Sequence, residues 1–165
     1  MKAYVMEELA EKNRFVKYPY SKSSLKKLEG VHPNMVDFAF ELAEIIDIRI
    51  VSGVRSDTEQ HEKFLSGLSS RDGYTKKSNH QPKADGLGYA LDMLPLPPGV
   101  NMYLEDGFED NIRWAQFDGA CQVLAWSMGI KIKTGFKWRS SLMDSLQRDE
   151  RANTLPDGNH VELIT

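Results

Sequence analysis

The sequence of 165 residues has few of the features that mark specialised protein classes. Its single cysteine, Cys121, excludes a disulfide within the chain. No apolar run approaches the roughly 18 residues that a membrane-spanning helix needs. Charge of one sign does not dominate either, because 21 lysines and arginines stand against 24 aspartates and glutamates, and no long basic run occurs. We therefore expect neither a disulfide scaffold nor membrane insertion nor nucleic-acid binding.

The beginning of the sequence also lacks a secretory leader. The segment MKAYVMEELAEKNRF contains neither an apolar core of the usual leader length nor a small-residue cleavage site. What is present is an ordinary globular composition, with 41% hydrophobic and 27% charged residues. Because this length suffices for one hydrophobic core, we expect a single domain over residues 1–165. We also expect a monomer.

Apolar spacing and capping signals predict a domain of mixed helices and strands. Helices are expected at residues 32–47, 56–67 and 111–129, with a further short helix between residues 140 and 159. Strands are expected at residues 48–54, 89–99, 130–138 and 160–164, the second with a proline-rich exit. Ser56 and Glu59 form a capping-box pattern at the start of the second helix, and Cys121 is expected to be buried in the third. We therefore expect an α+β fold in which helices pack against a small, mostly antiparallel sheet.

A long polar connection, residues 68–88, separates the second helix from the second strand. It contains three glycines and one proline. A connection of this length inside a small domain is usually functional. Polar side chains with useful chemistry also gather where strands begin or end: Arg55, His80, Asp92, Asp157 and His160. Because function tends to lie where loops meet a rigid sheet, we take these five residues as the candidate site.

His80, Asp92 and His160 could together form a hydrolytic metal centre. Such a centre needs three protein ligands and one open position for water, and two imidazoles with one carboxylate suit Zn²⁺. Asp157 precedes His160 by only three residues, so it could reach the same side of the site and act as a general base. Arg55 could hold a substrate carboxylate or a developing oxyanion.

Spacing alone leaves other interpretations open. His80 would also fit a solvated loop histidine, Arg55 a solvated charge after a strand, and Asp157 an ordinary turn residue. Asp92 is the strongest single signal, because an unpaired carboxylate in an otherwise apolar strand is costly. Asp85, in the glycine-rich part of the long connection, is the alternative carboxylate ligand.

Glu162 and the three tryptophans complete the set of candidates. Glu162 follows His160 by two residues, so in a strand both side chains point to the same face, and Glu162 could orient the histidine as a ligand. Trp138 could line a cleft. Core packing is the expectation for Trp114 and Trp126, which lie in the third helix.

Four segments, in order along the chain, resemble a family of zinc D,D- and L,D-peptidases, that of VanY, D-Ala-D-Ala carboxypeptidases and phage endolysins. SNHQPKADGLGYALD is similar to the family motif S-x-H-x-x-G-x-A-x-D, and DGNHVEL fits the later pattern of an acidic residue, two residues and a histidine. SGVRSDTEQ and SLKKLEGVHPNMV resemble an arginine-bearing segment and the leading segment of the phage-type members. The resemblance spans residues 20 to 164. The positions that correspond are Arg55, Ser78, His80, Gly88, Ala90, Asp92, Asp157 and His160.

The resemblance implies a role for each functional position. His80, Asp92 and His160 would be the zinc ligands, Asp157 would be the general base, and Arg55 would polarise or anchor the substrate. Weaker candidates for supporting a ligand or contacting the substrate are Ser78, Glu162 and Trp138. The implied fold is that of the hedgehog and D,D-peptidase domains, which agrees with the α+β fold expected from the pattern of helices and strands.

Two departures from the family pattern affect these expectations. Seven residues separate His80 from Gly88, where the family usually has two, and their proline and glycine content indicates that the extra residues loop out. The region that follows the expected third helix keeps Trp138 but lacks the G-G-D-W pattern of many phage members. The second departure leaves the wall of the cleft, and with it the substrate preference, open.

The expected function is zinc-dependent hydrolysis of the L-Ala–D-Glu bond in the stem peptides of peptidoglycan, without a separate cell-wall-binding module. The enzyme would stay in the host cytoplasm until a separate pore protein releases it to the cell wall at lysis. The alternatives are a D-Ala-D-Ala carboxypeptidase or dipeptidase, a non-catalytic zinc-binding domain of the same fold, and a structural virion component without metal. The lack of a leader argues against the carboxypeptidase, whose substrate lies outside the cytoplasm.

Overall fold

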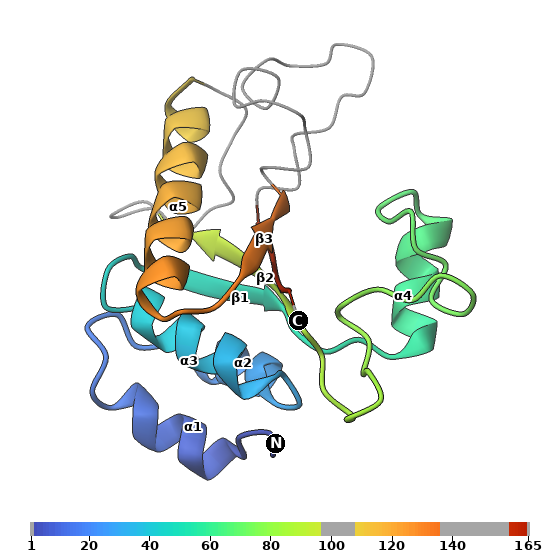
Figure 1. The fold of residues 1–165 in the computed structure, drawn as a ribbon, viewed down its shortest axis with the longest axis horizontal. Helices are drawn as coiled ribbons and strands as arrows, with labels where there is room; N and C mark the ends of the chain where they lie inside the picture. Colours follow the sequence, from blue (N-terminus) through green and yellow to red (C-terminus); the bar gives the residue numbers. More distant parts are fainter. Residues whose placement is uncertain (1, 97–107, 136–158, 165) are drawn as a thin grey trace.

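The computed structural model of the chain describes residues 2–96, 108–135 and 159–164 (Figure 1). Its elements in chain order are α1 (Met6–Asn13), α2 (Lys22–Leu28), α3 (Pro33–Leu42), β1 (Ile48–Ser52), α4 (Asp57–Leu65), β2 (Ala90–Pro95), α5 (Phe108–Ser127), β3 (Ile132–Thr134) and β4 (His160–Leu163). The α+β class and the antiparallel sheet expected from the sequence are confirmed. The short helix expected between residues 140 and 159 falls outside the described residues, apart from Asn159.

The helices differ from the expected ones near the amino terminus. Apolar spacing does not predict α1 and α2, because α1 buries only Leu9 and α2 has only seven residues. α3 follows its N-cap residue His32, as the sequence predicts, but it ends at Leu42 instead of residue 47. The Leu42 carbonyl accepts two hydrogen bonds in a tight turn there, and Ile45, within the range of the expected helix, is 52% exposed.

Of the two tryptophans expected in the core, only one lies there. Trp114 is buried and packs edge-on against Phe117 of the same helix, with ring centroids 6.0 Å apart. Trp126 is 84% exposed, so its expected core position is wrong. Twelve residues turn an α-helix about 120° past whole turns, which places the two indoles on different faces of α5. Cys121 is buried as expected. Among the described helices, none is both long and apolar enough to cross a membrane.

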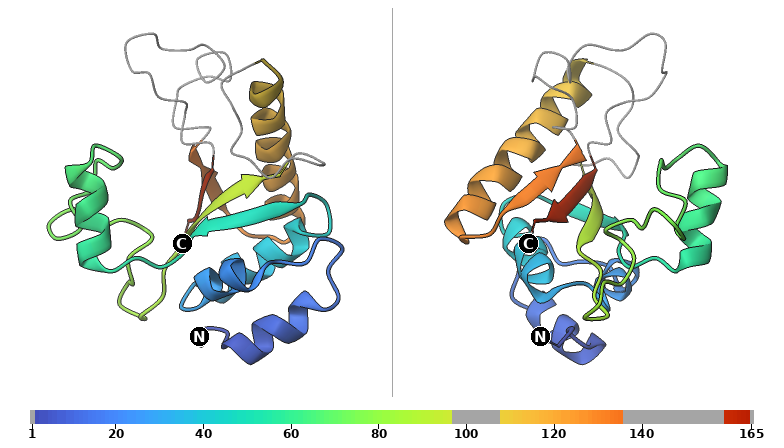
Figure 2. Two further views of the ribbon diagram at one scale, coloured as in Figure 1. Left: turned by 180° about the vertical axis from the view of Figure 1, so that it is seen from behind. Right: turned by 45° about the vertical axis from the view of Figure 1, so that its right-hand side comes forward.

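The strands form one sheet in the order β1-β2-β4-β3, with every neighbouring pair antiparallel. Side chains along a strand alternate between its two faces. On one face, Ile50 pairs with Met93 and Leu91 pairs with Val161, and all four are fully buried. They join Phe38 of α3 in a single apolar core between the sheet and the helices (Figure 2). This core makes the central strand β2 a rigid platform.

The outer edge of β1 is covered by α2. Ser24 Oγ accepts a hydrogen bond from the backbone N–H of Ile50 at 3.3 Å, and Lys27 Nζ donates one to the carbonyl of Ile50 at 3.1 Å. An edge strand otherwise leaves such groups unpaired. Two side chains of one helix therefore satisfy the outward backbone groups at the middle of β1.

The opposite face of the sheet carries polar side chains. Asp92 of β2 lies directly opposite His160 of β4 and opposite Ser52 of β1. The register of β1 shifts between Ile50 and Ser52, so this bulge brings Ser52 opposite the aspartate, where a regular ladder would have brought Val51. Three strands thus direct their polar side chains to one point.

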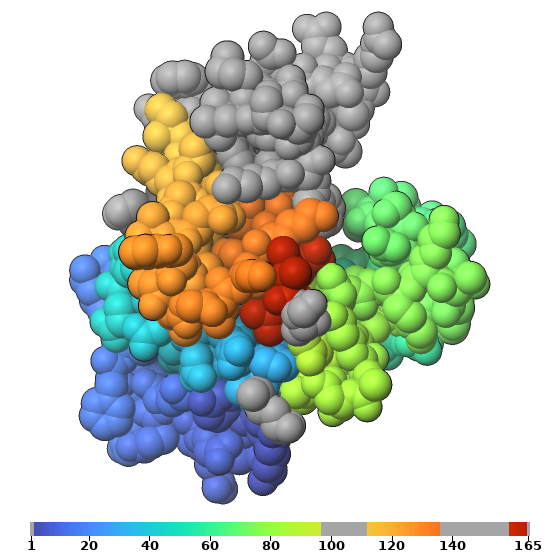
Figure 3. All heavy atoms as spheres, viewed as in Figure 1, coloured from blue at the N-terminus to red at the C-terminus, as the bar shows by residue number. Residues whose placement is uncertain are grey.

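Residues 56–78, called here the α4 lobe, stand apart from the sheet and from the other helices (Figures 1 and 3). The capping box expected at the start of α4 is present, because Ser56 Oγ accepts from the N–H of Glu59 and the Glu59 carboxylate accepts from the N–H of Ser56. The only buried residue of α4 is Gln60. The lobe therefore has no apolar core of its own around this helix.

Polar contacts organise the loop that closes the lobe. Asp72 Oδ1 accepts hydrogen bonds from three successive backbone N–H groups, those of residues 74–76, each at 2.8 Å. Gln81, which is fully buried, donates from Nε2 to the carbonyl of Gly73 at 2.7 Å and to Asp57 Oδ1 at 2.5 Å. These contacts tie both ends of the lobe to the segment that carries His80.

The extra residues between His80 and Gly88 loop out from the body. Residues 82–86 are all exposed, and the segment turns back through two backbone hydrogen bonds, from the N–H of Lys83 to the carbonyl of Leu87 and from the N–H of Gly86 to the carbonyl of Lys83. At Gly88 the chain rejoins the body and forms a parallel bridge with Val31. The insertion therefore does not separate His80 from β2, because His80 Nε2 lies 3.1 Å from Asp92 Oδ1.

Candidate metal centre

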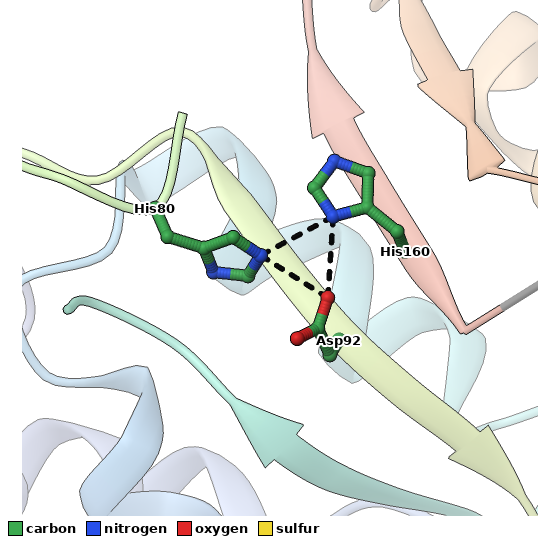
Figure 4. A group of neighbouring side chains, drawn as sticks. All are labelled: His80, Asp92 and His160. Atoms are coloured by element: carbon green, nitrogen blue, oxygen red, sulfur yellow. Dashed lines mark hydrogen bonds and ion pairs between the residues drawn. The ribbon is translucent and has the colours of Figure 1, made fainter. Parts of the chain in front are cut away.

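His80, Asp92 and His160 converge on the polar face of the sheet (Figure 4). β2 supplies the aspartate, β4 supplies one histidine, and the loop that follows the α4 lobe supplies the other. His80 Nε2 lies 3.1 Å from Asp92 Oδ1 and 3.2 Å from His160 Nδ1, and the last two atoms are 3.2 Å apart. All three residues are buried. Three donor atoms in a nearly equilateral triangle could bind one metal ion.

The second nitrogen of each imidazole is held by an acceptor. His80 Nδ1 lies 2.7 Å from the carbonyl oxygen of Gly53, and His160 Nε2 lies 3.1 Å from Glu162 Oε2. A carbonyl and a carboxylate can only accept, so these nitrogens carry the hydrogens. In this tautomer, His80 Nε2 and His160 Nδ1 carry the lone pairs that could bind a metal ion, as in metal sites whose histidines are oriented from behind.

Asp92 uses one oxygen for the triangle and the other for Arg55. Its Oδ2 forms a buried ion pair with Arg55 Nη2, which leaves Oδ1 directed to the histidines. Burial alone would raise the pKa of the Asp92 carboxyl, but the adjoining rings of His160 and His80 and the charge of Arg55 hold it far below its usual range. Asp92 is thus a carboxylate, the form that binds metal.

Arg55 is held in place by three acceptors. Besides Asp92, its Nε donates to Ser52 Oγ at 2.9 Å and its Nη1 donates to Gln60 Oε1 at 3.3 Å. The bulge in β1 is the reason that the serine hydroxyl is within reach. Through Gln60 the α4 lobe is connected to the carboxylate at the centre of the site. Arg55 also lines the cleft that contains the triangle.

Glu162 extends the site along β4. The hydrogen bond with His160 lowers the pKa of Glu162 to about 2, helped by Asn79 and by the charge of Lys133, while burial opposes the shift. Asn79 Nδ2 donates to the same oxygen, Oε2, at 2.7 Å. Lys133 lies directly opposite Glu162 in the β3–β4 pair. Glu162 is therefore ionised and fixed on the side of His160 that faces away from the triangle.

The remaining candidates lie in different places. Asp85 does not join the triangle, because its carboxylate accepts from the Tyr89 hydroxyl at 2.7 Å and from a backbone N–H of its own loop. Ser78 lines the cleft, and its Oγ accepts from the N–H of His80 at 3.3 Å. Asp157 and Trp138 lie outside the described residues.

Sequence reasoning missed three parts of this site. Gln60 is a polar residue within the expected helix 56–67, and nothing in its spacing distinguishes it from a solvated glutamine. Asn79 is next to His80, and its contact with a residue 83 positions later has no local signal. Gly53 contributes only a backbone carbonyl, which no side chain in the sequence indicates. The structure shows why glycine stands there, since an added Cβ would lie 1.8 Å from the carbonyl oxygen of Lys27.

Comparison with known proteins gives a consistent result. Residues 16–164 match the family model described as phage L-alanyl-D-glutamate peptidase. The structure is similar to the crystal structure of the Serratia marcescens L-Ala D-Glu endopeptidase ChiX, with a TM-score of 0.60 and 24% sequence identity over 90% of this chain and 92% of that chain. This second likeness shows a shared fold. No curated protein matches the chain in sequence.

Proposed function

Because the chain belongs to the family of phage L-alanyl-D-glutamate peptidases, we propose that it hydrolyses the L-Ala–D-Glu bond of peptidoglycan with a zinc ion held by His80, Asp92 and His160. The family makes it a peptidoglycan peptidase, whose substrate is the stem peptide. The observation that carries the zinc assignment is the buried triangle of two imidazole nitrogens and one carboxylate oxygen.

The dimensions of the triangle fit tetrahedral zinc. With ligand bonds of about 2.0–2.1 Å, two ligands of a tetrahedral ion lie about 3.3 Å apart. The three separations in the structure are 3.1, 3.2 and 3.2 Å. Two neutral histidines and one carboxylate also leave a fourth position for water, as a hydrolytic site requires. Zinc in such a site lowers the pKa of its water and polarises a carbonyl oxygen.

Asp157 and Arg55 would perform the steps that the metal ion does not. We assign the proton transfers to Asp157, because an acidic residue three positions before His160 corresponds to the general base of the family that the motifs resemble. Its carboxylate would take a proton from the attacking water and deliver one to the leaving amine of D-Glu. Arg55 keeps Asp92 ionised and oriented, and its additional part in stabilising the oxyanion remains a prediction.

The site of action follows from the same assignment. We propose that the enzyme acts on the cell wall after its release from the host cytoplasm at lysis, as a monomer. The polar cleft between the sheet and the α4 lobe would receive the stem peptide (Figure 3). Glu162 and Ser78 would support the ligands His160 and His80 from behind.

Digestion of purified peptidoglycan by the metal-loaded protein, followed by mass spectrometry of the fragments, tests this function. We expect new L-Ala carboxyl ends and D-Glu amino ends, which disappear with a chelator and return with Zn²⁺. Release of free D-Ala would instead indicate a carboxypeptidase. Zinc bound without any cleavage would indicate a non-catalytic domain, and no bound metal would overturn the site.

Variants of matched chemistry separate the assigned roles. His160→Ala should lose both zinc and cleavage, because one of three ligands is removed. Asp157→Asn should keep zinc and lose cleavage. Asp85→Asn is the control carboxylate and should keep both. Zinc lost from the control but retained by Asp92→Asn would contradict the ligand assignment.

A further inference from the structure

The cleft is basic although the chain is acidic. The chain has a formal net charge of −3. Among the residues that the structure describes, those with charge that line the cleft are five cations and two carboxylates, namely Arg55, Lys63, Arg71, Lys77 and Lys133 against Asp92 and Glu162. An excess of one charge in a cleft attracts ligands of the opposite charge. The cleft is therefore suited to an anionic substrate.

These cations are not equally available. Arg55 is engaged by Asp92, and Lys77 forms an ion pair with Asp57 at 2.6 Å, outside the cleft lining. Lys133 faces Glu162 across the β3–β4 pair. Among the described residues, the side-chain cations of Arg71 and Lys63 have no hydrogen-bond or ion-pair partner. Both belong to the α4 lobe.

The backbone of Arg71 is nevertheless fixed relative to the metal centre. The fully buried Gln60 donates from Nε2 to the carbonyl of Arg71 at 3.0 Å and to Ser69 Oγ at 2.8 Å. Its Oε1 accepts from Arg55, which in turn holds Asp92. One connected network thus runs from a metal ligand to the base of an exposed arginine. A group held in this way loses less freedom when it binds a ligand.

The chemistry of the bond that is cleaved requires a carboxylate near the reacting atoms. Glutamate has two carboxyl groups, and a linear stem peptide continues through only one of them. Whichever carboxyl continues the chain, the other stays free within a few bonds of the scissile nitrogen. Arg55 is already paired with Asp92. The free carboxylate of the substrate therefore needs another cation of the cleft if it is bound away from water.

We propose that Arg71, supported by Lys63 on the same wall, binds the free carboxylate of the D-Glu residue whose amide bond is cleaved. This inference rests on the proposed function. The planar guanidinium can bind a carboxylate through two parallel hydrogen bonds, which fixes its orientation as well as its position. Arg71 is then a specificity-determining residue that selects the acidic stem, and Gln60 is the residue that positions it.

A substrate pair tests this directly. Two synthetic stem peptides are compared, one with the free D-Glu carboxylate and one with that group converted to a carboxamide. For the zinc-loaded wild-type protein, we expect kcat/KM to be about tenfold higher for the carboxylate, as a charge-assisted contact predicts. In Arg71→Gln this preference should fall to about twofold or less, with the loss confined to the carboxylate peptide. Lys63→Gln should reduce it less.

Arg14→Gln is the matched control, because Arg14 is an exposed arginine at the end of α1, outside the cleft, and pairs only with Glu11 among the described residues. It should keep the wild-type preference. An Arg71→Gln protein that keeps the preference, or that loses activity equally on both peptides, would overturn the inference while leaving the proposed function intact. A wild-type protein that cleaves neither peptide would overturn the proposed function itself.

Discussion

Two helices of similar length, α3 and α4, are held in the molecule by opposite means. α3 has ten residues and buries six of them, all apolar. α4 has nine residues and buries one, the glutamine Gln60. The apolar side chains of the α4 lobe are largely exposed, with Phe64 at 40% and Leu68 at 73%. The body of the molecule is thus stabilised by apolar burial, and the lobe by hydrogen bonds.

The metal centre lies where these two regions meet. Asp92 and His160 come from the sheet of the body, whereas His80 follows directly after the lobe. Hydrogen bonds contribute less net free energy than buried apolar surface of similar extent, so the lobe should open locally at lower cost than the body. The comparison indicates that two ligands, Asp92 and His160, are held rigidly by the body, whereas the position of the third, His80, depends on the lobe.

The largest expected effect comes from the body. Phe38 is fully buried in α3, and Phe38→Ala should lower the free energy of unfolding by about 3–5 kcal/mol, because it removes a large apolar side chain and leaves a cavity. Phe64→Ala in the lobe is the matched control and should cost less than about 1 kcal/mol. Urea unfolding measures the free energy of unfolding of both variants. Equal losses would contradict the proposed difference between the two regions.

Gly53 tests the connection between the regions. A Cβ at this position would lie 1.8 Å from the Lys27 carbonyl oxygen, so Gly53→Ala should cost about 3 kcal/mol and weaken zinc binding by displacing the acceptor of His80. Gly119→Ala in α5 is the control, since its Cβ would meet no atom within 4 Å. Thermal unfolding and zinc titration report the two effects. Normal zinc affinity in a folded Gly53→Ala protein would argue against the role of that carbonyl.

Gln60 tests the lobe itself. Gln60→Ala leaves Arg55 Nη1 and the carbonyl of Arg71 without this partner, which should cost about 1–3 kcal/mol. The loss should be local, with faster hydrogen exchange at residues 69–78 and unchanged exchange in α3 and β2. Thr58→Ala, on the exposed side of α4, is the control. Uniformly faster exchange through the whole chain would show that the lobe and the body unfold together.

The smallest effect is electrostatic and also belongs to the lobe. Hydrogen bonds from the backbone N–H groups of Lys76 and Tyr74, and of Thr75, lower the pKa of Asp72 from its ordinary value of 3.8. A carboxyl whose pKa is lower in the folded state stabilises the lobe above pH 3.8 and ceases to do so as the pH falls through its folded value. Amide NMR shifts of these three residues should therefore titrate together below pH 3.8. A midpoint above it would contradict the loop geometry.

The contrast also explains what the sequence could predict. Asp92 and His160 could be predicted from the sequence because a polar side chain in an apolar strand needs a partner. The period of the strand also placed Glu162 on the same face as His160. The helices α3 and α5 could be predicted because apolar residues recur along them at helical spacing. The hydrogen-bond network of the lobe could not be predicted from the sequence, because Gln60 and Asn79 find their partners only through the tertiary fold. Asp157 and Trp138, outside the described residues, remain predictions.

The cover of α2 over β1 has a consequence for the behaviour of the protein at high concentration. A bare edge strand is a template on which a second chain can add its own strand, and such additions propagate into aggregates. Because Ser24 and Lys27 occupy both outward backbone groups of Ile50, an incoming strand would first have to displace an entire helix. At this edge, the same two side chains that complete the fold also guard against uncontrolled assembly.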